Sequence, residues 1–396
     1  MKHVVIVGAS VAGYRAAEGL RAEGFDGEIT MIGAEDLLPY DRPPLSKEVL
    51  TAEVLPTVDI ADPGWYSEHG ITLMLGRPAT GVDPEAQEIL VGETHIRYDE
   101  LIIATGARPR NPFDALPSGV ITLRTLDDAL HLRSALGRAQ NVAVIGGGFI
   151  GLEVASAVRS RGAETTVIEA ADIPLGRNLG PEAAHRVGDI ARGAGVHLRC
   201  GVGVQGFLGE THLSGLQLSD GSVVDCDLAV LGIGAIPNTE WLEGSGLRIE
   251  RLGLICDANG RAADRIWGVG DVSTWENHAG EPERHEHWTN AHQQAQVVVK
   301  NLLDGGHRRI ESADYIWSDQ FGHRLTIVGN TSLYDQISVH HPKDGSLTVL
   351  YARDGFLTGA CIVDQPRLAV QCRRWVAQNT SVRQIPEWRG EVLAVS

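Results

Sequence analysis

The sequence predicts an α/β protein, because one succession of local patterns occurs twice in its 396 residues. In each copy, a short apolar run enters a glycine-rich loop, and small and apolar residues then recur at helical spacing. A second apolar run follows and ends at a glutamate. The first copy covers residues 4–35 and the second covers residues 142–169. Continuous apolar runs are typical of parallel strands that are buried on both faces, so each copy predicts a βαβ unit.

Further apolar runs extend both units. We expect residues 101–106 and 228–231 to add a later parallel strand to the first and second unit, respectively. Residues 266–271 predict another strand, which precedes a helix at residues 291–303. Beyond residue 306, short apolar runs alternate with turns and lead to a helix at residues 368–377, which predicts a small α+β C-terminal domain. The strands expected in this domain lie at residues 325–328, 347–351 and 359–363.

The two glycine-rich loops have the spacing of dinucleotide-binding loops. In such loops the first glycine permits the turn, the second lets the backbone approach a pyrophosphate, and the third lets the helix pack on the strand. The pyrophosphate then lies at the positive N-terminus of the helix. We therefore predict two Rossmann-like dinucleotide-binding domains, the alternative being two structural βα turns. The loop residues are Gly8, Ser10, Ala12 and Gly13 in the first copy, and Gly146, Gly148 and Gly151 in the second.

Ser10 occupies the place of the second glycine in the first loop. Its hydroxymethyl group narrows the approach to a phosphate, but its hydroxyl can donate a hydrogen bond to a phosphate oxygen. We therefore expect a strained site at this loop rather than the loss of the site.

A glutamate follows each loop at the distance expected for a ribose-binding acid. Glu35 lies 22 residues after Gly13, and Glu169 lies 18 residues after Gly151, close to the usual ~20. The carboxylate at 169 would repel a 2′-phosphate, and the following residues 170–171 are both alanine. Arg177 is eight residues further on, too far to neutralise such a phosphate. The second site is therefore expected to prefer NADH over NADPH.

Composition narrows the class of protein. A formal net charge of −17 argues against non-specific binding to nucleic acid and to anionic membranes. No stretch approaches the ~20 apolar residues that a membrane helix needs, and no secretory signal precedes residues 4–7. Five dispersed cysteines without metal-binding spacing indicate reduced core thiols and a cytoplasmic protein. The sequence leaves the oligomeric state open.

Several segments resemble the bacterial FAD-dependent ferredoxin reductases of the putidaredoxin reductase and biphenyl-dioxygenase ferredoxin reductase family. The resemblance covers nearly the whole chain. It is carried by the segments LPYDRPPLSK (38–47), ATGARP (104–109), LRT (123–125), GGGFIGLE (146–153), GVGD (268–271), WTNA (288–291) and WSDQ (317–320).

The resemblance implies a glutathione-reductase-like arrangement with bound FAD and NADH. An FAD-binding domain would comprise residues 1–110 and 235–307, an NADH-binding domain residues 111–234, and the C-terminal α+β domain residues 308–396. Hydride would pass from NADH to flavin N5, and two single electrons would then leave to a [2Fe–2S] ferredoxin that serves a monooxygenase or ring-hydroxylating dioxygenase. Reduction of rubredoxin or another small carrier stays an alternative, as does a flavin-bound NADH sensor.

The resemblance also implies roles for individual residues. Lys47 would stabilise negative charge on the reduced flavin, and Glu153 would pair with it; these two are the candidate catalytic residues. FAD would be bound by the first glycine loop together with Glu35, Arg42, Lys47, Ala79, Ala104, Thr105, Gly106, Arg124, Asp271 and Trp288. NADH would be bound by the second glycine loop together with Ile150, Glu169 and Gly234.

Four further observations bear on the chemistry and on the partner. No cysteine pair follows the first glycine loop and none lies near Ser46, which argues against disulfide reductases, peroxidases and water-forming oxidases. The histidines around Trp288 occupy variable positions of the family motif, so we predict no metal site. Compared with the family, Ala313-Asp314 replaces a usual Val-Pro, and Asp364 replaces an asparagine. Basic residues that could dock an acidic ferredoxin are Arg308, Arg309, Arg324, Arg373 and Arg374, with solvated surface charges as the alternative.

Overall fold

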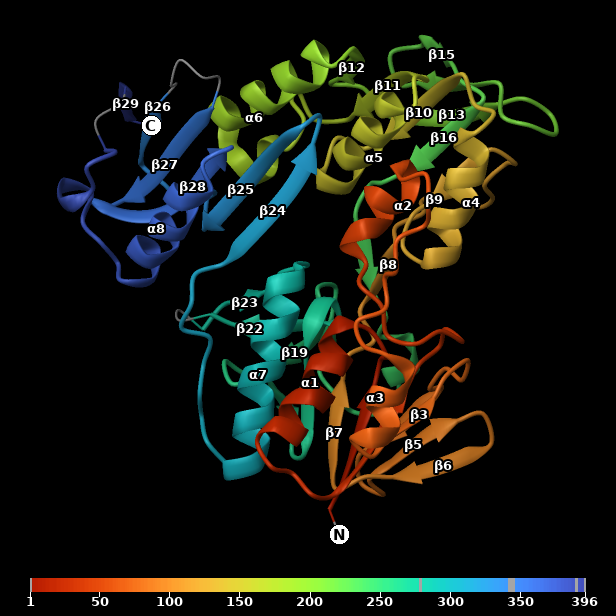
Figure 1. Ribbon diagram of the computed structural model, residues 1–396, viewed down its shortest axis with the longest axis vertical. Coiled ribbons are helices and arrows are strands. Elements are labelled where there is room, and N and C mark those ends of the chain that lie inside the picture. The colour runs from red at the N-terminus through yellow and green to blue at the C-terminus, as the bar shows by residue number, and fades with distance from the viewer. Residues whose placement is uncertain (1, 278–279, 341–345, 389–390, 395–396) are drawn as a thin grey trace. The chain divides into compact units, whose positions relative to one another are not determined.

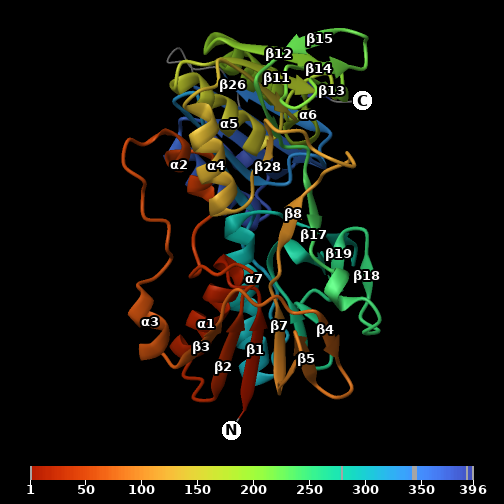
Figure 2. The same cartoon turned by 90° about the vertical axis from the view of Figure 1, so that its right-hand side faces the viewer.

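The structure is a computed structural model that describes residues 2–277, 280–340 and 346–388 and the backbone of residues 391–394. The chain divides into two compact units (Figures 1 and 2). The first unit contains Met1–Asp41, Thr57–Arg108 and Ala235–Glu311, and the second contains Arg42–Pro56, Pro109–Gly234 and Ser312–Ser396.

A six-stranded sheet forms the centre of the first unit, in the order β20-β21-β7-β1-β2-β3. The strands from β21 to β3 are parallel, and β20 pairs antiparallel to β21 at the edge. Their bounds are Arg261–Ala263 (β20), Ile266–Gly268 (β21), Glu100–Ile103 (β7), His3–Val7 (β1), Glu28–Ile32 (β2) and Ile71–Met74 (β3).

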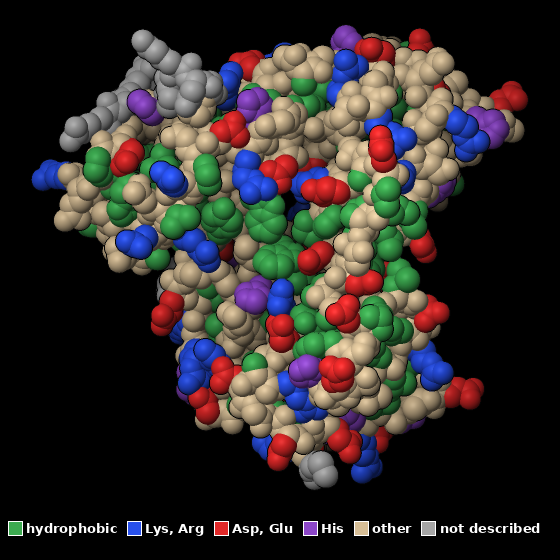
Figure 3. Space-filling model, in the orientation of Figure 1, with side chains coloured by type: hydrophobic (Ala, Val, Ile, Leu, Met, Phe, Trp, Pro, Cys, Tyr) green, Lys and Arg blue, Asp and Glu red, His purple; other side chains and the backbone are tan. Residues whose placement is uncertain are grey.

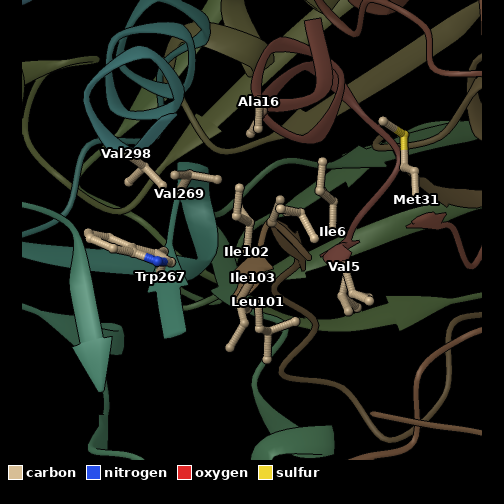
Figure 4. Packing of buried hydrophobic residues seen from close by; sticks show 14 of the residues in the cluster. Val5, Ile6, Ala16, Met31, Leu101, Ile102, Ile103, Trp267, Val269 and Val298 are labelled. Carbon is tan, nitrogen blue, oxygen red and sulfur yellow. The ribbon is translucent and has the colours of Figure 1, made fainter. Parts of the chain in front are cut away.

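The core of this unit is built by the apolar runs that predicted its strands. Val5 and Ile6 of β1 and Ile102 of β7 are fully buried, and Trp267 of β21 is 1% exposed (Figure 4). Helix α1 (Val11–Ala22) packs against helix α7 (Trp288–Asp304). The other elements of the unit are α3 (Pro63–Glu68), β4 (Gly81–Asp83), β5 (Glu88–Val91), β6 (Thr94–Arg97), β8 (Ala107–Pro109), β17 (Ala235–Pro237), β18 (Ile249–Glu250), β19 (Gly253–Cys256), β22 (Ser273–Glu276) and β23 (Pro282–Glu283).

A five-stranded parallel sheet in the second unit repeats this design, in the order β12-β11-β10-β16-β9. The strands are Val196–Cys200 (β12), Glu164–Glu169 (β11), Asn141–Ile145 (β10), Leu228–Leu231 (β16) and Val120–Thr122 (β9). The associated helices are α2 (Glu48–Thr51), α4 (Leu126–Leu136), α5 (Phe149–Ser160) and α6 (Gly176–Gly193). A small antiparallel sheet comprises β13 (Val204–Leu208), β14 (Gly215–Leu218) and β15 (Val223–Asp225).

The C-terminal segment of the second unit is an antiparallel sheet with one long helix. The sheet order is β24-β25-β28-β27-β26-β29, and helix α8 (Pro366–Ala377) packs on β25 and β28. The strands are Tyr315–Gln320 (β24), His323–Gly329 (β25), Gln336–His340 (β26), Leu347–Arg353 (β27), Phe356–Val363 (β28) and Glu391–Ala394 (β29). The predicted fold class, two Rossmann-like α/β parts with a small α+β C-terminal part, is confirmed.

Helix α6 is kinked where Gly180 precedes Pro181. Gly180 has a φ of 68°, and a proline inside a helix provides no N–H to the preceding turn. Two carbonyl groups next to the kink accept hydrogen bonds from the C-terminal part of the chain. The Tyr351 hydroxyl donates to the Leu179 carbonyl, and the Thr331 hydroxyl donates to the Asn178 carbonyl. These bonds connect the C-terminal part of the chain to helix α6 within the second unit.

The Tyr351 hydroxyl should therefore contribute measurably to stability. Tyr351→Phe leaves a buried carbonyl without this donor, so we expect the free energy of unfolding to fall by about 1–3 kcal/mol. Urea unfolding measures the change. The matched control is Tyr66→Phe, because the buried Tyr66 hydroxyl has no hydrogen-bond partner in the described part of the chain. Equal losses in the two variants would contradict this account.

Candidate dinucleotide sites

The first glycine loop connects β1 to α1 and has no space for larger side chains at its two glycines. Gly8 has a φ of 127°, and a Cβ there would lie 2.1 Å from the Ala104 carbonyl oxygen. A Cβ on Gly13 would lie 1.9 Å from the Gly8 carbonyl oxygen. Ser10 is the N-cap residue and has an ordinary extended backbone, with a φ of −131°. The first turn of α1 contains no acidic side chain, so its positive end is available to an anion.

The acid of the first unit is held by a residue that the sequence analysis did not single out. The Tyr40 hydroxyl donates to Glu35 Oε2 at 2.6 Å, and Tyr40 is only 3% exposed. Glu35 itself is half-buried. The aromatic ring fixes the direction of the carboxylate while leaving it accessible. The signal for Tyr40 was its place in the segment at 38–47, five residues after the acid.

Trp288 begins helix α7 and is fixed by a second acid. Its Nε1–H donates to Asp41 Oδ1 at 2.8 Å. Its ring stacks on His292, with centroids 6.0 Å apart and an interplanar angle of 5°, and the Arg15 guanidinium lies 5.8 Å from its centroid. Burial, followed by the nearby Arg15, lowers the pKa of His292. A neutral imidazole is therefore favoured beside the tryptophan.

The turn after β7 is closed by reciprocal hydrogen bonds. The Thr105 hydroxyl donates to the Asn238 carbonyl at 2.9 Å, and the Asn238 side-chain amide donates to the Thr105 carbonyl at 2.9 Å. Gly106 follows with a φ of 66°. Asp271 lies in the turn after β21, next to Gly270, whose N–H donates to Gln294 at 2.7 Å. These bonds fix the backbone at Ala104 and Asp271, two of the residues predicted to contact FAD.

The second glycine loop, between β10 and α5, has the same steric design. A Cβ on Gly146 would lie 2.2 Å from the Gly232 carbonyl oxygen, and one on Gly151 would lie 2.0 Å from the Gly146 carbonyl oxygen. A Cβ on Gly148, in contrast, would meet nothing within 4 Å. Packing therefore does not require glycine at 148, and the space beside it is open. Ile150, predicted to contact NADH, is 50% exposed at the start of α5.

Glu169 is held at both oxygens by backbone N–H groups. Gly147 donates to Oε2 at 2.7 Å, and Ala171 donates to Oε1 at 2.8 Å. Each carboxylate oxygen has a further lone pair that can accept a ribose hydroxyl. The second acid is thus bound to its own glycine loop, and Gly234 follows β16 with a φ of 102°.

A buried ion pair lies beside the second glycine loop. Lys47 Nζ donates to Glu153 Oε2 at 2.7 Å, and the two side chains are 13% and 6% exposed. The carboxylate also accepts from the Ser46 hydroxyl at 2.5 Å and from the Ser318 hydroxyl at 2.6 Å. Lys47 Nζ further donates to the Pro43 carbonyl at 3.1 Å. A buried charge pair needs such additional hydrogen bonds, and this pair has them.

The predicted FAD residues are divided between the two units. Arg42, Lys47 and Arg124 belong to the second unit, where Arg42 donates to the Arg124 carbonyl at 2.5 Å. The first unit contains the remaining FAD residues, namely Gly8, Ser10, Ala12, Gly13, Glu35, Ala79, Ala104, Thr105, Gly106, Asp271 and Trp288. All predicted NADH residues belong to the second unit.

The predictions about metal ligands, membrane helices and cysteines concern residues outside the glycine loops. Within the described residues, no group of three or more His, Cys, Asp or Glu side chains could hold a metal ion. His285 contacts Glu283 at 3.3 Å. Among the described residues, no helix is both long and apolar enough to cross a membrane. Burial raises the pKa of the Cys226, Cys361 and Cys372 thiols to about 12.

Some of the basic residues proposed for docking are already paired. Arg324 makes two hydrogen bonds to Asp319, at 2.7 and 3.0 Å, and Arg308 contacts Asp304 at 2.6 Å. The Arg373 guanidinium lies 5.5 Å from the centroid of the Tyr315 ring. Charges of both signs are interspersed over the face shown in Figure 3. Asp304 and Asp319 therefore offset the charges of Arg308 and Arg324, respectively.

Two glycine-loop sheets, each with a ribose-type acid, define a protein that binds two dinucleotides. Comparison with known proteins identifies the family to which it belongs. Residues 2–295 match the pyridine nucleotide-disulphide oxidoreductase family, and residues 315–385 match the reductase C-terminal family. The chain belongs to the pyridine nucleotide-disulphide oxidoreductase family, within the branch of the ferredoxin reductases. FAD and NAD(H), the predicted cofactors, are those that this family implies.

The similarity to individual ferredoxin reductases extends over almost the full length. The chain is 35% identical to the ferredoxin reductase component of chlorobenzene dioxygenase from Cupriavidus sp. (strain PS12), over 96% of this chain and 93% of that protein. It is 36% identical to the ferredoxin–NAD(+) reductase subunit of the benzene 1,2-dioxygenase system of Pseudomonas putida, over 92% and 90%. The covalent putidaredoxin reductase–putidaredoxin complex matches with a TM-score of 0.91 at 31% identity, over 96% of this chain and 93% of that chain.

The carboxylate at 169 should determine the choice of nicotinamide nucleotide. Glu169→Ala removes both the acceptor for a ribose hydroxyl and the charge that repels a 2′-phosphate. We expect the ratio of kcat/KM for NADH to that for NADPH to fall by at least about tenfold, or ~1.4 kcal/mol. Steady-state kinetics with both nucleotides measures the ratio. The control is Glu164→Ala at the exposed start of the same strand; an unchanged ratio in the Glu169 variant would refute the assignment.

Proposed function

We propose that this protein is an NADH-dependent, FAD-containing ferredoxin reductase. It passes electrons one at a time to a [2Fe–2S] ferredoxin, which serves a monooxygenase or a ring-hydroxylating dioxygenase. The observation that carries the proposal is the buried Lys47–Glu153 pair, at 2.7 Å, next to the second glycine loop. Relatives at 35% and 36% identity are ferredoxin reductase components of dioxygenase systems, which supports the same activity.

Cysteine positions support this choice over other activities of the wider family. All five cysteines lie at position 200 or later, so no redox-active thiol follows the first glycine loop. Thiol-based reduction of a disulfide or a peroxide would need one there. Lys47 and Ser46 stand in the relevant segment and provide a charge and a hydroxyl instead. The chain is therefore equipped for electron transfer without a covalent thiol step.

The loops fit the two nucleotides that we assign to them. A Cβ on Gly148 would meet nothing within 4 Å, so a pyrophosphate has room to approach the N-terminus of α5 at this residue. Bound FAD supplies the conversion between two-electron and one-electron transfer, since it can accept a hydride from NADH and release electrons singly. We assign Glu35 to the adenosine ribose of FAD and Glu169 to that of NADH.

Other residues orient the flavin and neutralise its charge. We propose that Arg42, Lys47 and Arg124 contact FAD through their side chains and that Ala79 and Ala104 do so through their backbone. Asp271 would bond the ribityl or pyrophosphate region, and Trp288 would lie beside the pyrimidine side of the ring. Gly148 and Ile150 would contact NADH, with Ile150 near the nicotinamide.

Lys47 has the most direct role in the chemistry. A fixed ammonium group beside the flavin stabilises negative charge as that charge develops, because it needs no reorganisation at the moment of reaction. Glu153 holds this ammonium in place and offsets its burial. The remaining requirement is orientation of the two rings, which the glycine loops and Trp288 provide. No general acid or nucleophile is needed.

The partner is an acidic one-electron carrier. Arg309, Arg373 and Arg374 are the basic residues of the proposed set that no acid pairs with in the described part of the chain. Arg373 and Arg374 are consecutive on helix α8 and can form a local positive area on a chain of net charge −17. Such a local area allows docking in spite of the overall charge. The absence of disulfides among five free cysteines, four of them buried, supports a reducing compartment, and we propose the cytoplasm.

Turnover with defined carriers tests the proposed function. We expect the purified protein to be yellow, and anaerobic NADH should bleach its flavin band. Steady reduction of cytochrome c should then require an added [2Fe–2S] ferredoxin and should weaken as salt is raised, since steering between charged surfaces is screened.

Each alternative has its own outcome in the same assay. A rubredoxin that outperforms every ferredoxin tested would favour a rubredoxin reductase. Slow bleaching without carrier-stimulated turnover would overturn the proposal in favour of a flavin-bound NADH sensor. A panel of ferredoxins, each assayed with matched amounts of NADH, identifies the carrier class directly.

A further inference from the structure

Strand β24 presents buried polar side chains where a core strand usually presents apolar ones. Neighbouring side chains on a strand point to opposite faces, so Ser318 and Gln320 share one face. They are 0% and 5% exposed. A buried hydroxyl or amide costs free energy unless it is hydrogen-bonded, and an apolar residue would pack there without that cost. The polar character of this face therefore needs a reason other than packing.

Glu153 provides that reason. The Gln320 amide donates to Ser318 Oγ at 3.0 Å, and the Ser318 hydroxyl in turn donates to Glu153 Oε1 at 2.6 Å. The other oxygen, Oε2, receives Lys47 and Ser46. Within the described part of the chain, Ser318 is the one donor to Oε1. Its hydroxyl thus balances the two donors on the opposite oxygen.

We propose that Ser318 is a positioning residue that acts through the Lys47–Glu153 pair and sets the reduction potential of the bound flavin. This inference rests on the proposed function, in which Lys47 contacts FAD. All the contacts that carry it lie within the second unit, where residues 42–56, helix α5 and the C-terminal sheet belong to one compact body. The C-terminal part of the chain thereby acts on the redox centre as well as on a partner.

The direction of the effect follows from electrostatics. A hydrogen bond to a carboxylate offsets part of its negative charge. Without the Ser318 hydroxyl, the charge of Glu153 is less offset, and Lys47 is drawn more strongly toward that carboxylate. Both changes reduce the positive potential that Lys47 provides. Because the reduced flavin carries more negative charge, it becomes less stable relative to the oxidised flavin, and the midpoint potential falls.

The test is the midpoint potential of FAD in the holoenzyme. For Ser318→Ala we expect the oxidised form to be favoured by about tenfold, which for a two-electron couple corresponds to a shift of roughly 30 mV to more negative values. Ser318→Thr keeps the hydroxyl on a β-branched side chain suited to a strand and should restore the wild-type potential. Ser318→Cys, of similar size with a weak donor, should shift the potential in the same direction by less.

Two further variants separate this role from a merely structural one. Ser338→Ala removes another buried hydroxyl of the same sheet, one without a partner in the described part of the chain, and should leave the potential unchanged. Glu153→Gln removes the negative charge and should shift the potential to more positive values. In that background Ser318→Ala should have little further effect, because the hydroxyl acts through the carboxylate.

The outcomes distinguish this inference from the proposed function. The role of Ser318 is overturned if the flavin potential of Ser318→Ala is unchanged, or if Ser318→Ala shifts the potential equally in the wild-type and Glu153→Gln backgrounds. Either result leaves ferredoxin reduction by the wild-type protein unaffected. Failure of the wild-type protein to reduce any carrier instead refutes the proposed function. If Ser318→Ala does not retain FAD, the other two variants provide the test. A more negative potential in Ser318→Cys with a wild-type potential in Ser318→Thr supports the role of Ser318, and an unchanged potential in both overturns it.

Discussion

The buried Lys47–Glu153 ion pair is the interaction on which the second unit depends. Two charges removed from water lose several kcal/mol of hydration each, and good geometry with further hydrogen bonds must offset that loss. The pair obtains these bonds from three separate parts of the chain. Residues 42–56 contribute Lys47 and Ser46, helix α5 contributes Glu153, and the C-terminal sheet contributes Ser318. A functional charge thus also determines which segments must pack together.

Local patterns in the sequence predicted the parallel sheets and both glycine loops well. Buried strands such as β1 and β10 are continuous apolar runs, and the first and last glycines of each loop occur where a Cβ would strike a carbonyl oxygen. Helix α4 also carried a readable signal that the sequence analysis did not use. Thr125 and Asp128 form a reciprocal capping box at its start. The small antiparallel sheets lacked such a signal, because strands of two to five residues are too short to show a clear periodicity.

Contacts between distant residues could not be predicted in the same way. The resemblance implied that Glu153 pairs with Lys47, but nothing local indicated Ser318, which lies 165 residues from Glu153. Likewise, the sequence Gly180-Pro181 shows where α6 must kink. The Leu179 carbonyl beside the kink accepts a hydrogen bond from the Tyr351 hydroxyl, and these two residues are 172 positions apart. Each partner is defined by the completed fold. A buried polar group indicates that a hydrogen-bond partner exists, but it does not indicate where in the chain that partner lies.

The departures from the family pattern fit the same physical reading. The family resemblance predicts an asparagine at the position of Asp364, whose φ of 59° lies in the left-handed region that both residues tolerate better than most. Its carboxylate accepts the Arg324 backbone N–H at 2.8 Å and bonds His323 at 2.6 Å. An asparagine side-chain oxygen could also accept the backbone N–H, but it would carry no charge beside the imidazole. The substitution therefore preserves the turn and adds a negative charge to the exposed end of β25, whereas the buried face of β24 keeps its bonds to Glu153. Asp364 therefore acts on exposed residues of the C-terminal sheet, whereas the inner face of that sheet is constrained by the bond between Ser318 and Glu153.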